Sequence, residues 1–275
     1  MNYQTFSVII DKASVDHLKS WFEEFVLDYT SGDDDFRKSA KLKVIHTKNV
    51  CSEILILGKS LGLTDDELRL AEIIALLHDI GRFEQLRQYM TFSDGLSDDH
   101  ADMGIRLIRQ HGLLDHFSSQ VRSVISRSVM LHNKPSLPKA ADDVSLFYPR
   151  LIRDADKLDI WKVILSHYHR NDNEKNEMLT LNLPDTPGYS EKVYDSLLKG
   201  KIVDIKNVRN LNDFKLLQTG WIYDINFKPA FESIKNRRYL ELTREVLPQT
   251  EKTDRIFISV MAYLEDRIRP PLADV

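Results

Sequence analysis

The chain has 275 residues, a formal net charge of −4, and 42% hydrophobic against 29% charged residues. This balance is typical of a soluble folded protein, and the absence of a basic block disfavours binding to a nucleic acid polymer. The single cysteine, Cys51, excludes an intramolecular disulfide and a cysteine-rich zinc site, and it favours a reducing, cytoplasmic environment. Neither a secretory leader pattern nor an apolar run of about 18 residues is present, so we expect no secretion by that route and no membrane partner.

Helical periodicity dominates the sequence, and the alternation that marks strands is scarce. We therefore predict an all-α fold, with helices near residues 15–28, 40–61, 65–80, 98–111, 118–132 and 147–168, the last entered through Pro149. Thr64 and Glu67 have the spacing of a capping box for the third helix. The polar stretch 171–201 suggests a loop or insertion. We predict a helical core over residues 1–170, with a loop and a helical extension packed on it over residues 171–275.

Three polar residues stand where the helical pattern expects apolar ones. His46 shares a face with Val50 and Ile54, and Asp154 is the charged member of a stripe that also holds Leu158. His78 lies on the apolar face of the preceding helix. A divalent cation would compensate these buried groups together, since imidazole and carboxylate are common metal ligands. Taken singly, each has a structural alternative: a core histidine bonded to the backbone, or an ion pair of Asp154 with Arg82 or Lys157.

The motifs LLHDIGR, with the pair His78 and Asp79, and RDADKLD, with Asp154, follow His46 in order and rough spacing. Over about residues 42–161 this series resembles the H…HD…D signature of the HD superfamily of metal-dependent phosphohydrolases. The resemblance implies a helical bundle, so that residues 1–170 would form an HD-type core. It also implies a metal held by His46, His78, Asp79 and Asp154.

Two further histidines bear on the number of metals. His100 and His132 match positions where dinuclear members of the superfamily, including cyclic-dinucleotide phosphodiesterases and mixed-valent diiron oxygenases, carry additional ligands; Asp79 would then bridge the ions. The alternatives are an exposed residue near a helix start for His100 and a helix C-cap for His132. The sequence thus indicates one or two divalent ions and does not distinguish Mn, Fe, Zn, Ni, Co and Mg.

The predicted chemistry is hydrolysis of a phosphoester by metal-activated water, with Asp79 orienting the water. Arg82 is a catalytic and phosphate-binding candidate, Lys157 a catalytic candidate and Lys134 a further substrate contact. Salt bridges are the alternatives for Arg82 and Lys157. The expected partner is a small phosphorylated substrate, a monoester or diester of nucleotide-like character. A mixed-valent diiron oxygenase and a non-catalytic metal-binding regulatory module are the competing hypotheses.

The segment 221–238 alternates aromatic and basic residues. This pattern is typical of an amphipathic helix that packs on a core, and a lid over a substrate is the alternative. An exposed aromatic face in this region is also the surface on which we would expect a homodimer to form.

Overall fold

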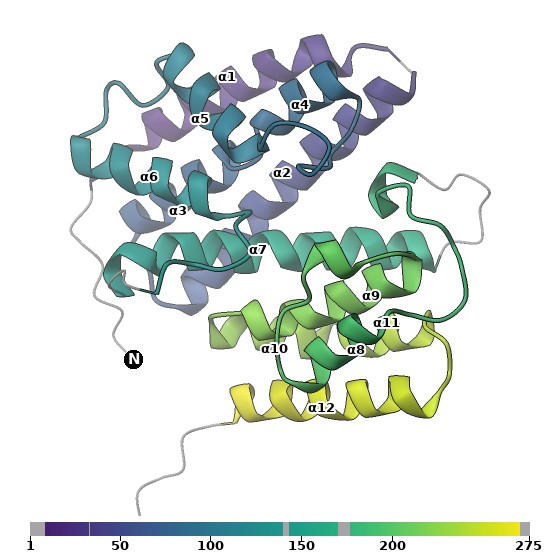
Figure 1. The fold of residues 1–275 in the computed structure, drawn as a ribbon. Helices are drawn as coiled ribbons and strands as arrows, with labels where there is room; N and C mark the ends of the chain where they lie inside the picture. Colours follow the sequence, from purple (N-terminus) through teal and green to yellow (C-terminus); the bar gives the residue numbers. More distant parts are fainter. Residues whose placement is uncertain (1–8, 33, 140–142, 170–176, 270–275) are drawn as a thin grey trace, which may run out of the picture. The chain divides into compact units, whose positions relative to one another are not determined.

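The computed structural model describes residues 9–32, 34–139, 143–169 and 177–269 (Figure 1). These residues form helices and connecting segments with no strand among them, which confirms the predicted all-α fold. The chain divides into two compact units, Met1–Asp159 and Ile160–Val275, whereas we had placed the division after residue 170. Of the helices described, none combines the length and apolar character needed to cross a membrane.

The described residues of the first unit contain seven helices: α1 (Lys12–Thr30), α2 (Asp35–Ser60), α3 (Asp65–Leu77), α4 (Gly81–Tyr89), α5 (His100–Gln110), α6 (Ser119–Leu131) and α7 (Asp143–Tyr168), which continues past the end of the unit. Helix α2 packs along α3, α1 contacts both, and α5 lies between α4 and α6. Leu18, Ile54, Leu57 and Ile74 are fully buried in this core. Their burial supplies the main stabilising free energy of the bundle.

Aspartate and threonine caps set where the first helices begin. The predicted capping box is present: the Thr64 amide donates to Glu67 Oε2 at 2.7 Å, and the Glu67 amide donates to Thr64 Oγ1. Helix α2 begins at Asp35, earlier than residue 40, because the Asp34 carboxylate accepts from the Arg37 amide. Asp34 is therefore the N-cap of α2.

The segment after α3 turns instead of continuing to residue 80. Helix α3 ends at Leu77, and α4 starts at Gly81 as a separate helix. Gly81 allows the backbone of α4 to lie against the start of α5, since a Cβ at this position would collide with the carbonyl oxygen of His100 and stand 2.6 Å from the Gly104 amide nitrogen. The turn therefore carries His78 and Asp79 to the end of α3 next to α5.

Helix α7 also begins earlier than predicted. It starts at Asp143, so Pro149 lies inside the helix and does not open it. Proline cannot donate a backbone hydrogen bond, but burial of Leu146, Phe147 and Tyr148 favours the additional turns.

Most helices of the second unit are short, and α12 is the longer one among those described: η1 (Glu177–Thr180), α8 (Glu191–Leu198), η2 (Ile205–Asn207), α9 (Leu211–Gly220), η3 (Trp221–Asp224), α10 (Lys228–Asn236), α11 (Tyr239–Glu245) and α12 (Glu251–Ile268). The expected loop over 171–201 thus contains η1 and α8, while residues 171–176 lie outside the described residues. Segment 221–238 divides into η3 and α10. Helix α10 is amphipathic, and it buries Phe231 and Ile234 and packs against α12.

Candidate metal centre

Four histidines and two aspartates of the first unit come together from five segments of the chain. His46 lies in the middle of α2, His78 and Asp79 follow α3, and Asp156 lies in α7. His100 is the first residue of α5, and His132 follows the last residue of α6. All six side chains are less than one fifth exposed, although imidazole and carboxylate are both ionisable groups.

Each imidazole is oriented by an acceptor at its Nδ1 atom. His78 Nδ1 is 2.7 Å from the Ala75 carbonyl oxygen, and His132 Nδ1 is 2.7 Å from that of Val129. These carbonyls lie in the last turns of α3 and α6, where backbone carbonyl groups lack an N–H partner within the helix. Because a carbonyl only accepts, Nδ1 must carry the proton, and the neutral ring presents the lone pair of Nε2.

Carboxylates orient the other two rings. His46 Nδ1 is 2.7 Å from Asp159 Oδ2, and His100 Nδ1 is 2.8 and 2.9 Å from the two oxygens of Asp94. Ionised carboxylates also only accept hydrogen bonds, so these rings too are protonated at Nδ1. All four Nε2 atoms therefore face a common interior region, an arrangement found around metal ions in proteins.

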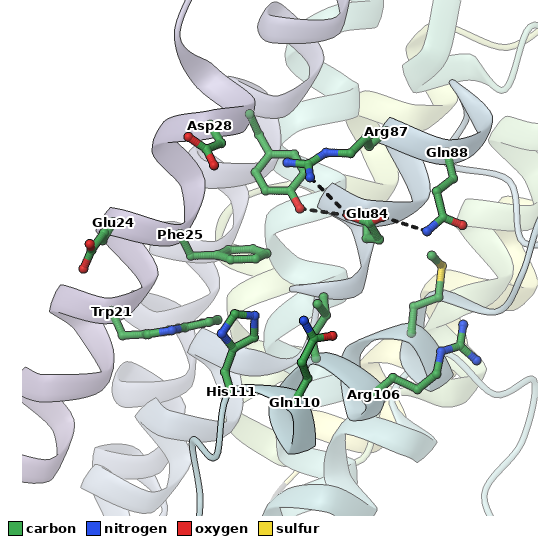
Figure 2. Close-up of a pocket in the computed structure, with 13 residues that line it drawn as sticks. Trp21, Glu24, Phe25, Asp28, Glu84, Arg87, Gln88, Arg106, Gln110 and His111 are labelled. Carbon is green, nitrogen blue, oxygen red and sulfur yellow. Dashed lines mark hydrogen bonds and ion pairs between the residues drawn. The ribbon is translucent and has the colours of Figure 1, made fainter.

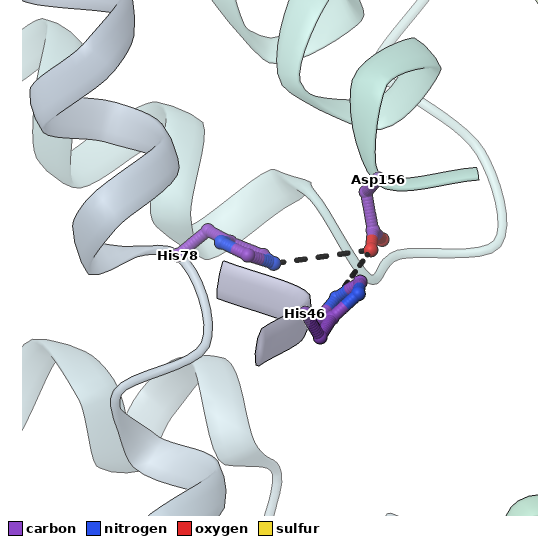
Figure 3. Close-up of side chains that lie close together, drawn as sticks. All are labelled: His46, His78 and Asp156. Atoms are coloured by element: carbon purple, nitrogen blue, oxygen red, sulfur yellow. Dashed lines mark ion pairs between the residues drawn. The ribbon is translucent and has the colours of Figure 1, made fainter. Parts of the chain in front are cut away.

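The first group of ligand atoms consists of His46, His78 and Asp156 (Figure 3). His46 Nε2 is 3.0 Å from Asp156 Oδ1, and His78 Nε2 is 3.8 Å from the same oxygen. Asp79 Oδ2 lies 3.7 Å from the first nitrogen and 3.8 Å from the second. Ligands about 2.1 Å from a tetrahedral ion are about 3.4 Å apart, so this spacing fits one divalent cation.

The second group lies on the other oxygen of Asp79. Asp79 Oδ1 is 3.2 Å from His100 Nε2 and 3.5 Å from His132 Nε2. The two nitrogens are themselves 2.9 Å apart. Two lone pairs cannot face each other at this distance without a proton or a cation between or beside them. The two oxygens of Asp79 thus face two separate pairs of histidines.

Buried nitrogens without hydrogen bonds support a metal at the first group. Nε2 of His46 and Nε2 of His78 are buried and have no hydrogen-bond partner, since the approach of Asp156 to His46 lacks hydrogen-bond direction. Leaving such atoms unpaired costs free energy, and coordination would remove that cost. The donor set of imidazoles and carboxylates suits zinc, iron, manganese, cobalt and nickel. The residues present therefore fit a divalent ion.

The pKa values of the two histidines of the first group are shifted in opposite directions. Burial and the nearby Lys43 ammonium would lower the pKa of His46, but the adjacent carboxylates of Asp156 and Asp159 raise it to about 9. Burial lowers the pKa of His78 to about 4, although the charges of Asp79 and Asp156 act in the opposite direction. Burial alone would raise the pKa of Asp79, yet Lys43 and His78 bring it well below its ordinary value. Asp79 is thus an anion with positive charge on one side.

The structure places Asp156 beside the imidazoles, and the sequence-based choice of Asp154 is corrected accordingly. Asp154 is fully buried, but it does not belong to the groups of metal-ligating atoms found among the described residues. The error has a physical origin: residues 151–159 of α7 are buried around almost the whole circumference of the helix. An apolar stripe therefore does not identify the face that points to the histidines.

The three predicted basic residues have defined contacts. Arg82 Nη1 donates to the Phe92 carbonyl and to Asp94 Oδ1, at 2.6 and 3.0 Å, and Arg82 Nε is 3.5 Å from Asp79 Oδ1. Lys134 Nζ donates to Asp99 at 2.6 Å. Lys157 is buried, and its Nζ is 3.4 Å from the Arg153 carbonyl oxygen. Arg82 borders the histidine cluster, whereas these contacts of Lys134 and Lys157 link them to a loop and to the preceding turn of α7.

Sequence reasoning missed three residues that shape the cluster. Asp159 and Asp94 orient histidines, and Lys43 Nζ lies 2.8 Å from Asp79 Oδ2 and 5.3 Å from the centre of the Phe92 ring. Lys43 precedes His46 by three positions in α2, and this spacing is a signal that it shares the face of His46. Asp159 stands three positions after Asp156 in RDADKLD and carries the same signal. No periodicity identifies Asp94, because it lies in the loop between α4 and α5.

A separate cleft of about 710 Å³ lies between α1, α4 and α5 (Figure 2). Trp21 stacks on Phe25 with ring centres 4.9 Å apart, and His111 lies against both rings. Glu84 accepts a hydrogen bond from Tyr29 and pairs with Arg87. None of the six clustered histidines and aspartates lines this cleft, so it is distinct from the candidate metal centre.

The first unit thus combines a helical fold with a buried cluster of histidines and aspartates that could hold a metal ion. A family model, the HD domain, matches residues 44–161, and this match confirms the resemblance to the HD superfamily that the sequence motifs predicted. HD domains are in general metal-dependent hydrolases that bind divalent metals. Searches of curated proteins and of solved structures gave no match.

Proposed function

We propose that the first unit is a metal-dependent phosphohydrolase that acts on a small phosphomonoester or phosphodiester of nucleotide-like character. The observation that carries this proposal is the convergence of four imidazole Nε2 atoms on the two oxygens of Asp79. This arrangement supports two metal positions that share Asp79: one with His46, His78 and Asp156, and one with His100 and His132.

A divalent ion bound here would lower the pKa of a coordinated water and withdraw charge from a phosphoryl oxygen. Asp79 lies between the two positions, where its carboxylate would orient the attacking water. Its burial excludes bulk solvent from the same region. The protein then needs no side-chain nucleophile, in agreement with ligand groups that, among the described residues, consist of histidines and aspartates and include no cysteine.

Lys43 is the residue that we assign to the substrate phosphate. Its side chain is 18% exposed while that of Asp79 is 5% exposed, so Lys43 lies on the solvent side of the cluster. An ammonium group at this position attracts a phosphate oxygen without fixed directional demands. Phe92 lies next to Lys43 and offers a ring face for a planar group of the substrate. This pair supports the nucleotide-like class.

Arg82 is assigned to positioning and not to phosphate. Its Nη1 atom has three acceptors within hydrogen-bond distance, Gln85, the Phe92 carbonyl and Asp94, and a phosphate would have to replace them. Lys134 is likewise engaged with Asp99, and we retain it as a lesser substrate contact at the margin of the cluster.

A diiron oxygenase is the second candidate function. The specific observation in its favour is the shared Asp79 with nitrogen ligands on both sides, since two adjacent irons with histidine and carboxylate ligands also activate dioxygen. The two candidates differ in their co-substrate, which is water for the hydrolase and dioxygen for the oxygenase.

The test is a screen of the protein, loaded separately with Mn²⁺, Co²⁺, Zn²⁺ and Fe²⁺, against nucleotides, cyclic dinucleotides and generic phosphoesters. We expect release of phosphate or of an alcohol under anaerobic conditions, and loss of this activity in Asp79→Ala. The exposed Asp98→Ala provides a matched control that keeps activity. Turnover that requires dioxygen, together with a diiron absorption band, would replace the hydrolase with the oxygenase. Full metal loading without any turnover would favour the regulatory module.

A further inference from the structure

The two metal positions have the same internal plan. Each contains one histidine oriented by a backbone carbonyl, His78 or His132, and one oriented by a carboxylate, His46 or His100. A carboxylate behind an imidazole fixes its orientation and increases its basicity as a ligand. The two carboxylates therefore contribute to affinity in a way that the two carbonyls do not.

The carboxylates differ in their structural support. Asp159 belongs to α7 and its side chain is fully buried, whereas Asp94 lies in the loop between α4 and α5 with its side chain 33% exposed. The orientation of His46 is thus built into a helix. The orientation of His100 depends on the conformation of a loop.

Two residues of α4 hold this loop. Gln85 is fully buried, and its Nε2 atom donates to Asp94 Oδ1 at 2.8 Å and to Ser97 Oγ at 2.7 Å, with the Asp98 carbonyl oxygen at 3.2 Å. Arg82 donates to the same Asp94 oxygen and to the Phe92 carbonyl. Burial of a glutamine amide costs free energy unless its hydrogen bonds are made, so Gln85 ties the loop firmly to α4.

A third set of possible metal-ligating side chains lies next to the second metal position. Asp94, Asp99 and His100 offer ligand atoms close to one another. Their carboxylates, however, already accept from Asn133 Nδ2 and Lys134 Nζ, with distances of 2.8 and 2.6 Å at Asp99. We therefore treat Asp94 as the partner of His100 and not as a ligand of another ion.

We propose that Asp94 is the positioning residue of the second metal position, and that Gln85 sets its place, so that the loop between α4 and α5 controls metal affinity at His100 and His132 alone. This inference rests on the proposed two-metal function. It adds that the metal affinity of one position depends on a helix, whereas the metal affinity of the other depends on a loop.

The experiment measures Mn²⁺ and Co²⁺ binding to the full chain by calorimetry and equilibrium dialysis. The wild type is expected to bind two ions. Asp94→Ala should weaken one binding event about 10- to 100-fold and leave the other unchanged. Asp98→Ala, in the same loop, is the matched control and should leave both unchanged, because its carboxylate pairs with Arg106 on the surface. Unchanged affinities in Asp94→Ala, or equal weakening of both events, would overturn the proposal.

A double-mutant cycle separates positioning from a general effect on folding. Because Asp94 acts through His100, adding Asp94→Ala to His100→Ala should cause no further loss of affinity. If Asp94→Ala does not fold, Gln85→Met is used in its place, with a smaller loss at the same event expected and an unchanged affinity counting against the proposal. A wild type that binds one ion refutes the inference even if it hydrolyses phosphoesters. A wild type that binds two ions but hydrolyses nothing refutes the proposed function only.

Discussion

Two fully or almost fully buried aspartates, one in each unit, show how differently a buried carboxylate is stabilised. Asp213 in α9 accepts hydrogen bonds from the Ser190 amide, the Ser190 hydroxyl and the Arg209 amide, at 2.6, 2.6 and 2.9 Å. Asp79 in the first unit faces the Lys43 ammonium and four imidazole nitrogens.

The difference teaches which buried polar residues indicate a site. The partners of Asp213 are mostly backbone donors that have no other role, so its carboxylate holds a loop to a helix. The partners of Asp79 include Nε2 atoms whose own hydrogen bonds are missing. Burial of a charge is therefore common to both aspartates, and unsatisfied ligand atoms distinguish the candidate metal centre.

The largest effect is expected for Asp79→Ala. We expect metal affinity to fall more than about 100-fold at both positions, since both oxygens of Asp79 are removed, while the helical circular dichroism spectrum is retained. Metal content by mass spectrometry and the spectrum of the same sample provide the measurement. Retention of both ions at wild-type affinity would show that Asp79 resembles Asp213 and has a structural role.

Asp156→Ala tests the corrected ligand. Loss of Asp156 should weaken the ion at His46 and His78 about 100-fold and spare the other position. Asp154→Asn, two residues earlier in α7, should keep both ions, because Asp154 does not belong to the clustered ligand atoms. Calorimetric titration of each variant with Mn²⁺ makes the comparison, and the opposite result would restore Asp154 as the ligand.

Asp213→Ala should lower the free energy of unfolding of the second unit by about 3 kcal/mol, because three donors lose their acceptor at about 1 kcal/mol each. Chemical denaturation with two probes measures this loss. Asp195→Ala, on the exposed surface of α8, is the matched control and should change stability little. Metal binding should be the same in both variants; a loss of metal in Asp213→Ala would remove the distinction between the two aspartates.

The smallest effect is expected for chemical modification of Cys51. This side chain is buried and does not belong to the groups of possible metal ligands found among the described residues. Burial, and then the nearby Glu72 carboxylate, raise its pKa to about 12, so the reactive thiolate is scarce at neutral pH. Alkylation of the native protein by iodoacetamide should therefore be at least about 10-fold slower than that of the unfolded protein at pH 8. Fast native alkylation with a midpoint near pH 8.5 would show that Cys51 is accessible.

Much of the fold could be predicted from the sequence because it depends on local patterns. The apolar faces of α1, α3 and α6 and the capping box at Thr64 follow from spacing within a few residues. The boundaries at Asp35 and Gly81 were missed, since one depends on an aspartate acting as a cap and the other on a backbone contact with α5.

The cluster was less predictable, because its geometry depends on contacts between distant segments. The structure brings together His46, His78, Asp79, His100 and His132, which the motifs had singled out. Asp156 was missed because α7 is buried almost all round, and Asp94 because a loop has no periodicity. Lys43 was overlooked, although its spacing from His46 in α2 was informative.

The glycine contact between α4 and α5 has a consequence for protein engineering. Gly81 stands against the backbone of His100 and Gly104, so main-chain atoms, and not side-chain rotamers, set the separation of Asp79 from His100. Redesign of side chains alone would therefore change which ion the centre prefers but not the distance between its two halves. An engineer who wishes to admit larger ions, or to separate the two halves, would have to begin at residue 81.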